Sequence, residues 1–247
     1  MKANHVGKIT QQGISVVIPM YNEEDNIRLC LNLLQKVLTR VTDDYEIVVV
    51  NDASTDKSPA MVEELAAINN KIRMLDHTVN QKLGGTLKTG FAAARKDVIM
   101  YMDADLPFDM EEVVRAVRIM HERHADVISV YRYSRRGEGL RRMIYSYVYN
   151  FMIRMLFGVH IKDVNFSFKL FKKEIFSSFS LLSSGSFIDA ELLIMCARKG
   201  YTIAQFGADY FPRRRGTSRL SSIPVILKII CEMIKFRILL LLQPKDR

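Results

Sequence analysis

Residues 97–109 read DVIMYMDADLPFD, an apolar run that stops abruptly at two carboxylates, Asp103 and Asp105. The run VIMYM is typical of a strand that is buried in a sheet. Carboxylates at the tip of such a strand repel each other unless a cation or a hydrogen-bond donor lies between them. The stretch therefore predicts a buried strand whose end meets a charged partner.

The same rhythm extends in both directions along the chain. Further strand-like runs read ISVVIPM, YEIVVVND, KIRMLDH and ADVISVY, and helical patterns cover residues 24–40, 56–69, 85–95 and 110–123. Strands that alternate with helices of this length predict an α/β fold with a mostly parallel central sheet, flanked by helices on both faces.

The rhythm changes after residue 131. A basic loop, RYSRRGEGLRR, precedes a long aromatic helix, an alternating strand around FSFKLF, another helix and a final apolar segment. We expect the first half to form a nucleotide fold and the second half to build the site of another substrate. Because 247 residues with 49% hydrophobic content can bury one sizeable core, we predict one domain, residues 1–220, and an apolar C-terminal helix in residues 221–247.

The composition narrows the class of partner. Lys and Arg together number 36 against 27 Asp and Glu, a formal charge of +9, which favours an anionic partner such as a nucleic acid, a phosphorylated ligand or an acidic membrane surface. Three widely spaced cysteines without a CxxC pair favour reduced thiols in a cytoplasmic setting. A nucleic-acid-binding protein is a remote alternative, because it leaves the DAD carboxylates without a purpose.

Polar residues follow each of the first four strand-like runs. In open α/β sheets, ligands gather at the carboxyl ends of the strands. Asp, Asn, Ser and Gly are also the usual residues of helix caps and turns, so any single cluster is ambiguous. The clusters are Pro19, Tyr21, Asn22 and Glu23; Asn51, Asp52, Ser54 and Asp56; Asn80, Gly84 and Gly85; and Asp103 and Asp105.

The DAD stretch carries the most specific chemistry. Side chains at positions i and i+2 of a strand share a face, so Asp103 and Asp105 can approach one cation. Hard oxygen ligands suit Mg²⁺ or Mn²⁺, held jointly with the phosphates of a ligand.

Five motifs in order resemble those of family-2 glycosyltransferases with the Rossmann-like GT-A fold. More narrowly, they are similar to polyprenyl-phosphate glycosyltransferases, including dolichol-phosphate mannose synthase. The resemblance implies an inverting hexosyltransferase that moves a sugar from a nucleotide sugar, GDP-mannose or a UDP-sugar, to a polyprenyl phosphate. The motifs are VVIPMYNEEDNI (16–27), VVVNDASTDKS (48–58), MDADL (102–106), DVNFSFKLFKKE (163–174), and FIDAELL (187–193) with FPRRRGTSRL (211–220).

The resemblance assigns roles on the donor side. Pro19, Tyr21 and Glu23 would line the base pocket, and Asp52 would hydrogen-bond the base or the ribose; a helix cap is the alternative for Asp52. Asp103 and Asp105 would hold Mg²⁺ or Mn²⁺ on the diphosphate, with Asp105 counted among the catalytic residues. FPRRRGTSRL would close over the diphosphate through Arg213 and Arg219. A solvated basic run or a lipid-binding patch is the alternative for that segment.

On the acceptor side, the resemblance assigns Arg132, Arg142 and Ser146 to the lipid phosphate, for which arginine is suited by its planar fork and fixed charge. Arg132, Arg142 and Asp163 are expected among the catalytic residues. A phosphate acceptor is already anionic near pH 7, so a strong general base is unnecessary. Asp163, Asp189 and Glu191 remain candidate bases or orienting groups. A polysaccharide or protein hydroxyl is the alternative acceptor, and it requires such a base.

The helix that begins near Arg141 has a polar stripe on an otherwise apolar surface, because Arg142, Ser146, Asn150 and Arg154 recur every four residues. Two interpretations are open. The apolar face packs in the core, or the helix lies in a membrane interface with phosphate ligands on its polar face.

The sequence departs from the family at three places. Pro107 stands where many relatives have a metal-binding Gln, so Asp109 or a water is expected to fill in. Ser167, Phe168 and Lys169 replace a G-F-R motif, and Asn51 replaces the first Asp of a common D-D pair.

Residues 223–242 have the length of a membrane span but include Lys228, Glu232, Lys235 and Arg237. Because each central charge costs about 2.5–3.5 kcal/mol on insertion, crossing is disfavoured, whereas lying on the membrane is not. Docking on the protein's own core or on a second subunit is the alternative. We therefore expect a monotopic enzyme at the cytoplasmic face of a membrane, with no nucleic-acid partner.

Overall fold

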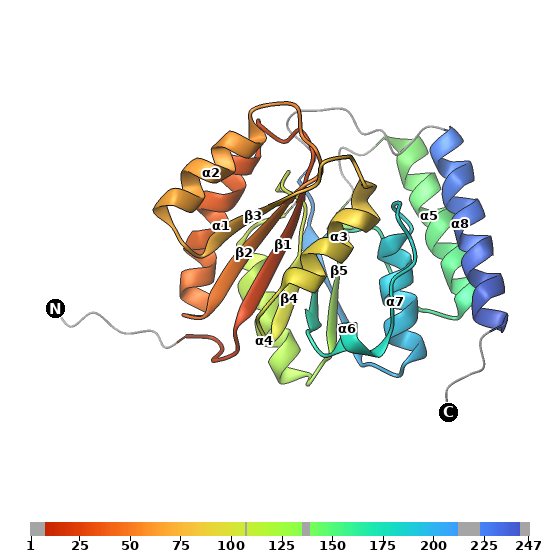
Figure 1. Cartoon of the computed structure of the whole chain (residues 1–247). Helices are drawn as coiled ribbons and strands as arrows, with labels where there is room; N and C mark the ends of the chain where they lie inside the picture. The colour runs from red at the N-terminus through yellow and green to blue at the C-terminus, as the bar shows by residue number, and fades with distance from the viewer. Residues whose placement is uncertain (1–7, 107, 135–138, 212–222, 243–247) are drawn as a thin grey trace.

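The computed structural model describes residues 8–106, 108–134, 139–211 and 223–242. Within these ranges, seven strands form one sheet in the order β3-β2-β1-β4-β6-β5-β7 (Figure 1). The strands are β1 (Ile14–Met20), β2 (Tyr45–Asn51), β3 (Ile72–Asp76), β4 (Val98–Tyr101), β5 (Val127–Ser134), β6 (Lys169–Lys172) and β7 (Ile203–Asp209).

The sheet is mostly parallel, as the alternation of strands and helices predicted. β1 to β4 run parallel to one another, and β7 runs parallel to β5. β6 is antiparallel to both of its neighbours, β4 and β5. β7 was not predicted, because its sequence IAQFGAD is only half-buried at the edge of the sheet and lacks the continuous apolar run of the central strands.

Helices cover both faces of the sheet, because successive side chains of a buried strand point to opposite faces. Val16 and Ile18 of β1 face a cluster that includes residues of α1 and α4, whereas Val17 faces a cluster that includes α3 and α7. A Cβ at Gly90 of α3 would clash with Val17, so this glycine permits the close approach of α3 to the sheet. The helices are α1 (Ile27–Val41), α2 (Ser58–Ile68), α3 (Lys82–Ala93), α4 (Glu111–Glu122), α5 (Leu140–Phe157), α6 (Ile175–Ser178), α7 (Ile188–Arg198) and α8 (Ile223–Leu242).

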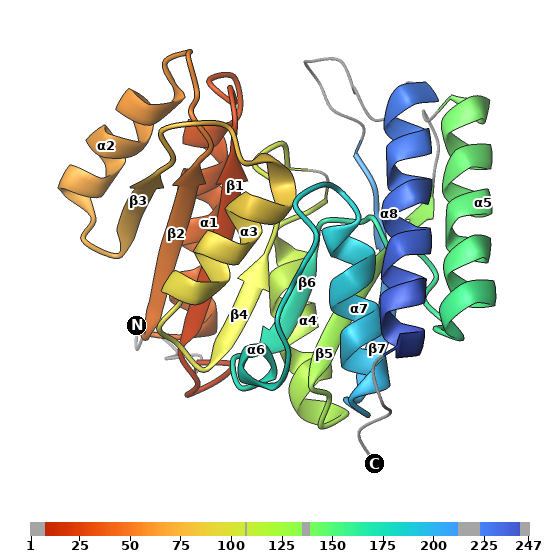
Figure 2. The same ribbon diagram turned by 45° about the vertical axis from the view of Figure 1, so that its right-hand side comes forward.

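The C-terminal helix α8 lies alongside α5 and α7 (Figure 2). Its side chains Met233, Phe236 and Leu240 are buried in the same cluster as α7, at helical spacings of three and four. One face of α8 therefore docks on the protein's own core, which was the alternative weighed for this segment. None of the helices in the described ranges is long and apolar enough to cross a membrane.

Candidate active site at the carboxyl edge of the sheet

The loops that follow β1 and β4 meet at the point where the strand order changes direction. From β1 the chain moves outward through β2 and β3, and it then returns to place β4 on the other side of β1. In doubly wound sheets, ligands bind in the crevice at such a switch point. Residues 19–23 and Asp103 and Asp105 therefore come from loops that flank one crevice.

Three carboxylates of these loops act electrostatically on one buried thiol. Burial raises the pKa of Cys30 in α1 far above its ordinary value, and the negative charges of Asp105, Glu23 and Asp103 raise it further. Burial likewise raises the pKa of Tyr101 in β4, with Asp103, Asp189 and Asp105 adding to the effect. Asp103 and Asp105 thus act through their charge on buried groups of both α1 and β4, which places these two carboxylates near both elements.

Hydrogen bonds join the loop after β1 to the loop after β2. Asn22 donates its backbone N–H to Ser54 Oγ at 3.0 Å and accepts the N–H of Thr55 through Oδ1 at 2.8 Å. Asp56 accepts the N–H of Glu24 at 3.0 Å. Ser54 and Asp56 thus hold the loops in shape, which is the structural role that the sequence left open for them. Among the residues expected in the base pocket, Pro19 and Glu23 are half-buried and Tyr21 is 44% exposed.

Asp52 is buried and its carboxylate is occupied by three donors. Oδ1 accepts the Nδ1–H of His77 at 2.8 Å and the N–H of Gln81 at 2.7 Å, and Oδ2 accepts the N–H of Lys82 at 2.9 Å. Asp52 is therefore a cap for the start of α3. No sequence motif singles out His77, because a histidine at the end of a strand-like run carries no pattern of its own.

Asp103 and Asp105 fit a divalent cation that is shared with a ligand. Both are partly exposed at the end of β4. Among the described residues, no group of three or more His, Cys, Asp or Glu side chains is arranged to hold a metal by itself. Mg²⁺ is commonly held by one or two carboxylates together with substrate phosphates, which matches this donor set. Pro107 lies outside the described residues.

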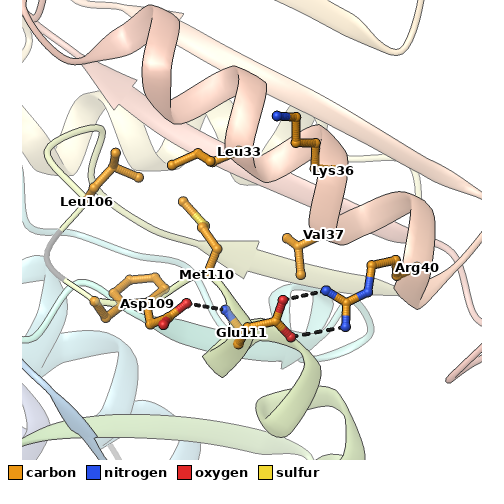
Figure 3. A pocket seen from close by; sticks show the side chains of 9 residues that line it. Leu33, Lys36, Val37, Arg40, Leu106, Asp109, Met110 and Glu111 are labelled. Carbon is orange, nitrogen blue, oxygen red and sulfur yellow. Dashed lines mark hydrogen bonds and ion pairs between the residues drawn. The ribbon is translucent and has the colours of Figure 1, made fainter.

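Asp109, a candidate third ligand, accepts a backbone hydrogen bond at the start of a helix. Its Oδ1 accepts the N–H of Glu111 at 2.9 Å at the start of α4. It lines a cleft of about 400 Å³ between α1 and α4 (Figure 3). An ion pair between Arg40 and Glu111 lies at the rim of this cleft, whose other lining residues include Leu33, Val37, Leu106, Phe108 and Met110.

On the acceptor side, the structure brings Arg132 and Asp163 together. Nε and Nη2 of Arg132 donate to the two oxygens of Asp163 at 2.7 and 3.0 Å, and the side chains are 7% and 2% exposed. The guanidinium also lies over the ring of Tyr210, 5.4 Å from its centroid. A bidentate pair of this kind fixes the plane of the arginine. Ser146 is half-buried on α5, whereas the side chain of Arg142 and the residues Arg213 and Arg219 lie outside the described parts.

The other two candidate bases are also engaged. Asp189 Oδ1 lies 2.6 Å from Lys169 Nζ, which is fully buried and also donates to the carbonyl of Phe166. Burial raises the pKa of Asp189, and the charge of Lys169 opposes that rise. Glu191 accepts the N–H groups of Leu182 and Ser183 at 2.6 and 2.7 Å. The sequence signal for Lys169 was a charged residue within the apolar run FSFKLF.

The two halves of the site touch at the start of α3. Gly84 donates its N–H to the carbonyl of Ser184 at 3.0 Å, and a Cβ at Gly84 would clash with the backbone of Ser183. The loop before α7, which Glu191 holds, is thereby packed on the helix that Asp52 caps.

Helix α5 buries a face of mixed polarity and exposes many apolar side chains on its other side. Asn150 is half-buried and accepts the N–H of Val164 at 3.0 Å, and Tyr149 and Ile153 are buried beside it. Apart from Arg154, the exposed side chains described on this helix are mostly large and apolar, unlike those of an ordinary surface helix. The exposed members are Leu140, Met143, Ile144, Tyr145, Tyr147, Val148, Phe151 and Met155.

Comparison with known sequences identifies a family. The model of glycosyl transferase family 2 matches residues 15–179. The glycosyltransferase AglD of Haloferax volcanii is 32% identical over 210 residues, which cover 81% of this chain and 33% of AglD. The undecaprenyl-phosphate 4-deoxy-4-formamido-L-arabinose transferase of Aeromonas hydrophila is 26% identical over 203 residues, which cover 81% of this chain and 57% of that protein. The chain thus spans only a third to somewhat over half of these relatives.

Solved structures share the fold. Glucosyl-3-phosphoglycerate synthase from Mycobacterium tuberculosis, in complex with Mn²⁺ and UDP-glucose, superposes with a TM-score of 0.70 at 21% identity, covering 91% of this chain and 78% of that one. The mannosyltransferase PcManGT from Pyrobaculum calidifontis, in complex with GDP-Man and Mn²⁺, gives a TM-score of 0.62 at 18% identity, covering 88% and 69%. The family and the fold predicted from the motifs are confirmed.

Proposed function

The chain belongs to glycosyl transferase family 2, and we propose that it transfers a sugar, with inversion, from a nucleotide sugar to the phosphate of a polyprenyl phosphate. The observation that carries the acceptor assignment is the buried pair of Arg132 and Asp163, which fixes the plane of the Arg132 guanidinium and engages Asp163 in an ion pair. The name of the Aeromonas relative, an undecaprenyl-phosphate sugar transferase, supports the same class of acceptor.

The donor nucleotide would bind in the crevice between the loops after β1 and β4, with Pro19, Tyr21, Glu23 and Asp52 on the base side. The complexes of the neighbouring enzymes with UDP-glucose or GDP-Man and Mn²⁺ support a donor of this class. A divalent cation held by Asp103 and Asp105 would supply positive charge against the negative charge that builds on the leaving diphosphate. Arg213 and Arg219 are proposed to close over the same diphosphate.

On the acceptor side, Arg132 and Ser146, with Arg142, would hold the lipid phosphate so that one of its oxygens attacks the anomeric carbon from the face opposite the leaving group. Because a phosphate monoester is already anionic near neutral pH, no proton has to be removed before attack. Positioning and electrostatic stabilisation would supply most of the rate. Asp163 would act by fixing the plane of Arg132.

A hydroxyl acceptor is less well supported. It requires a carboxylate that can take a proton, and the three acceptor-side candidates are engaged. Asp163 is paired with Arg132, Asp189 with Lys169, and Glu191 accepts two backbone N–H groups. A hydroxyl acceptor would therefore have to displace an existing hydrogen-bond or ion-pair partner from one of these carboxylates before its proton could be taken.

For localisation, we propose a peripheral, monotopic association with the cytoplasmic face of a membrane. The outward faces of α5 and α8, which lie side by side, carry exposed apolar side chains such as Phe151, Met155, Ile234, Ile238 and Leu241 (Figure 2). Single exposed apolar residues are ordinary, but many of them on two neighbouring helices are typical of an interaction surface. A lipid-linked acceptor would be reached from the same surface.

The direct test is mass spectrometry of the products formed from a panel of UDP- and GDP-sugars with Mn²⁺ or Mg²⁺. The acceptor is a polyprenyl phosphate, and the matched control is the corresponding polyprenol, which offers a hydroxyl in place of the phosphate. We expect a glycosyl phosphate product from the first and none from the second. Transfer to the polyprenol, or to neither lipid with any donor, would contradict the proposal.

A further inference from the structure

We propose that His77 is a positioning residue of the donor site, which fixes the carboxylate of Asp52 and, through it, the loop between β3 and α3. His77 follows β3 and belongs to none of the motifs discussed above. The inference rests on the proposed function, because it concerns how the nucleotide half of that site keeps its shape.

His77 connects three elements of the fold. Its Nδ1 lies 2.8 Å from Asp52 Oδ1 after β2, and its Nε2 lies 2.9 Å from the hydroxyl of Thr89 in α3. Its backbone N–H also donates to the carbonyl of Asn51 at 2.9 Å. The side chains of His77 and Asp52 are only 6% and 4% exposed, so water competes little for these hydrogen bonds.

The tautomer follows from these contacts. An ionised carboxylate only accepts hydrogen bonds, so Nδ1 of His77 carries a proton and donates it to Asp52. In the neutral ring, Nε2 then accepts the hydroxyl proton of Thr89. Both nitrogens are satisfied, and the ring plane is fixed at both ends.

Asp52 passes this restraint to the next loop. Gln81 and Lys82 donate their backbone N–H groups to its two oxygens, and the side-chain amide of Asn80 donates to its backbone carbonyl at 3.2 Å. These bonds hold Lys82 at a φ of 63°, in the left-handed region that residues other than glycine and asparagine avoid. The network thus maintains a loop conformation that the local sequence does not favour.

The arrangement leaves one acceptor position on the carboxylate of Asp52. A carboxylate offers about four acceptor sites, and three of those on Asp52 are used by His77, Gln81 and Lys82. The remaining lone pair is on Oδ2, beside the N–H of Lys82. With His77 in place, Asp52 can offer this one site to an N–H or O–H of the nucleoside without rotating. Without His77, the carboxylate can rotate and the loop loses its anchor.

Binding measurements on three variants test the role. His77→Leu removes the donor to Asp52, His77→Asn keeps an N–H near the position of Nδ1, and Thr89→Val releases only the far side of the ring. The probes are UDP-glucose and GDP-mannose with Mn²⁺, measured by calorimetry, and Mn²⁺ with inorganic pyrophosphate, which reads the metal and diphosphate half alone. Ser15→Ala is the matched control, because it removes another buried hydrogen bond, to Glu46 at 2.7 Å, at the opposite end of β1.

We expect His77→Leu to lower the affinity for the nucleotide sugar that the wild type prefers by about tenfold or more, because one charge-assisted hydrogen bond is lost. His77→Asn should stay within about threefold of the wild type, and Thr89→Val should fall between the two. Pyrophosphate binding should be unchanged in all three, and Ser15→Ala should lower the Tm without affecting either probe.

The inference is overturned if His77→Leu binds the nucleotide sugar as tightly as the wild type, or if pyrophosphate affinity falls by the same factor, as general loosening of the fold would cause. If His77→Leu does not fold, equal binding by Thr89→Val and the wild type overturns it. A wild type that binds pyrophosphate but neither nucleotide sugar contradicts the proposed function instead, so the two failures are distinguishable.

Discussion

The carboxylate of Asp163 accepts two hydrogen bonds from the guanidinium of Arg132, at 2.7 and 3.0 Å, and both side chains are almost completely buried. The pair joins the end of β5 to the segment before β6. Removal of either member takes the bidentate partner away from a buried charge, which is strongly destabilising.

Asp163→Asn should therefore impair both folding and acceptor use. We expect the free energy of unfolding in urea to fall by about 3 kcal/mol, and the KM for polyprenyl phosphate to rise while Mn²⁺-dependent binding of the nucleotide sugar persists. The control is Glu64→Gln, which breaks an exposed ion pair with Arg28 and should cost less than about 1 kcal/mol. If the folded Asp163→Asn protein has an unchanged KM for polyprenyl phosphate, the pair of Arg132 and Asp163 is not part of the acceptor site.

Asp105→Asn should abolish transfer and Mn²⁺-dependent donor binding while the protein stays folded, because a neutral amide cannot balance a divalent ion. Titration of Mn²⁺, followed by electron paramagnetic resonance in the presence of a nucleoside diphosphate, measures the loss directly. Asp109→Asn is the control from the same loop, since Asp109 caps α4. Normal activity of Asp105→Asn at limiting metal would refute the metal assignment.

Substitution of the outward face of α8 tests the membrane surface. The triple variant Ile234→Ser, Ile238→Ser and Leu241→Ser removes exposed apolar area, and we expect its affinity for anionic vesicles to fall more than about tenfold. Nucleotide-sugar binding should persist. Phe236→Ala, on the buried face of the same helix, should instead lower stability by about 3–5 kcal/mol. Full co-sedimentation of the triple variant with vesicles would contradict the proposed surface.

The ends of α4 and α7 allow a matched test of backbone strain. Both close with the same pair of backbone bonds, but α4 places His124 at a φ of 48° where α7 places Gly200 at 79°. A non-glycine residue in this region costs about 1–2 kcal/mol. We expect His124→Gly to raise the free energy of unfolding by about 1 kcal/mol, and Gly200→Ala to lower it by a similar amount although no atom lies near its Cβ position. Thermal and urea unfolding measure both, and changes of equal sign would contradict the strain.

Glu46 should contribute to the acid sensitivity of the fold. Burial alone would raise its pKa, but hydrogen bonds from Ser15, the Arg95 N–H and Arg73, with the charge of Arg73, hold the pKa below its ordinary value. A carboxyl group with a lowered folded pKa stabilises the protein above its unfolded pKa, about 4.3, and this stability is lost as the pH falls through the folded value. Glu46→Gln should lower the free energy of unfolding at pH 7. It should also make that free energy fall less steeply as the pH drops below about 4. If the free energy of unfolding falls with decreasing pH in the same way in both proteins, this contribution of Glu46 is excluded.

The strands of the first half were predictable because their apolar runs are local signals. The start of α3 was not. The sequence places it at Gly85, whereas the helix begins at Lys82. The N–H groups of Gln81 and Lys82 are satisfied by Asp52, about 30 positions earlier in the chain, and no local pattern reveals such a cap.

The candidate site divides in the same way. Asp103 and Asp105 can be recognised from the sequence alone, because two carboxylates directly after an apolar strand-like run are unusual. Lys169 and His77 cannot be recognised in this way, because their partners, Asp189 and Asp52, come within hydrogen-bond distance only in the folded chain. The roles assigned to Arg142, Arg213 and Arg219 remain predictions.

The antiparallel strand β6 lies between β4 and β5, although it follows both in the sequence. During synthesis, β4 and β5 have therefore left the ribosome before the strand that joins them exists. Until residues 169–172 emerge, each of these strands has an open edge with unpaired backbone groups, a template for pairing with other chains. A fragment that ends before β6 would keep those edges permanently, so we expect the part of the chain from β1 to β5 to become prone to aggregation when it is separated from the rest.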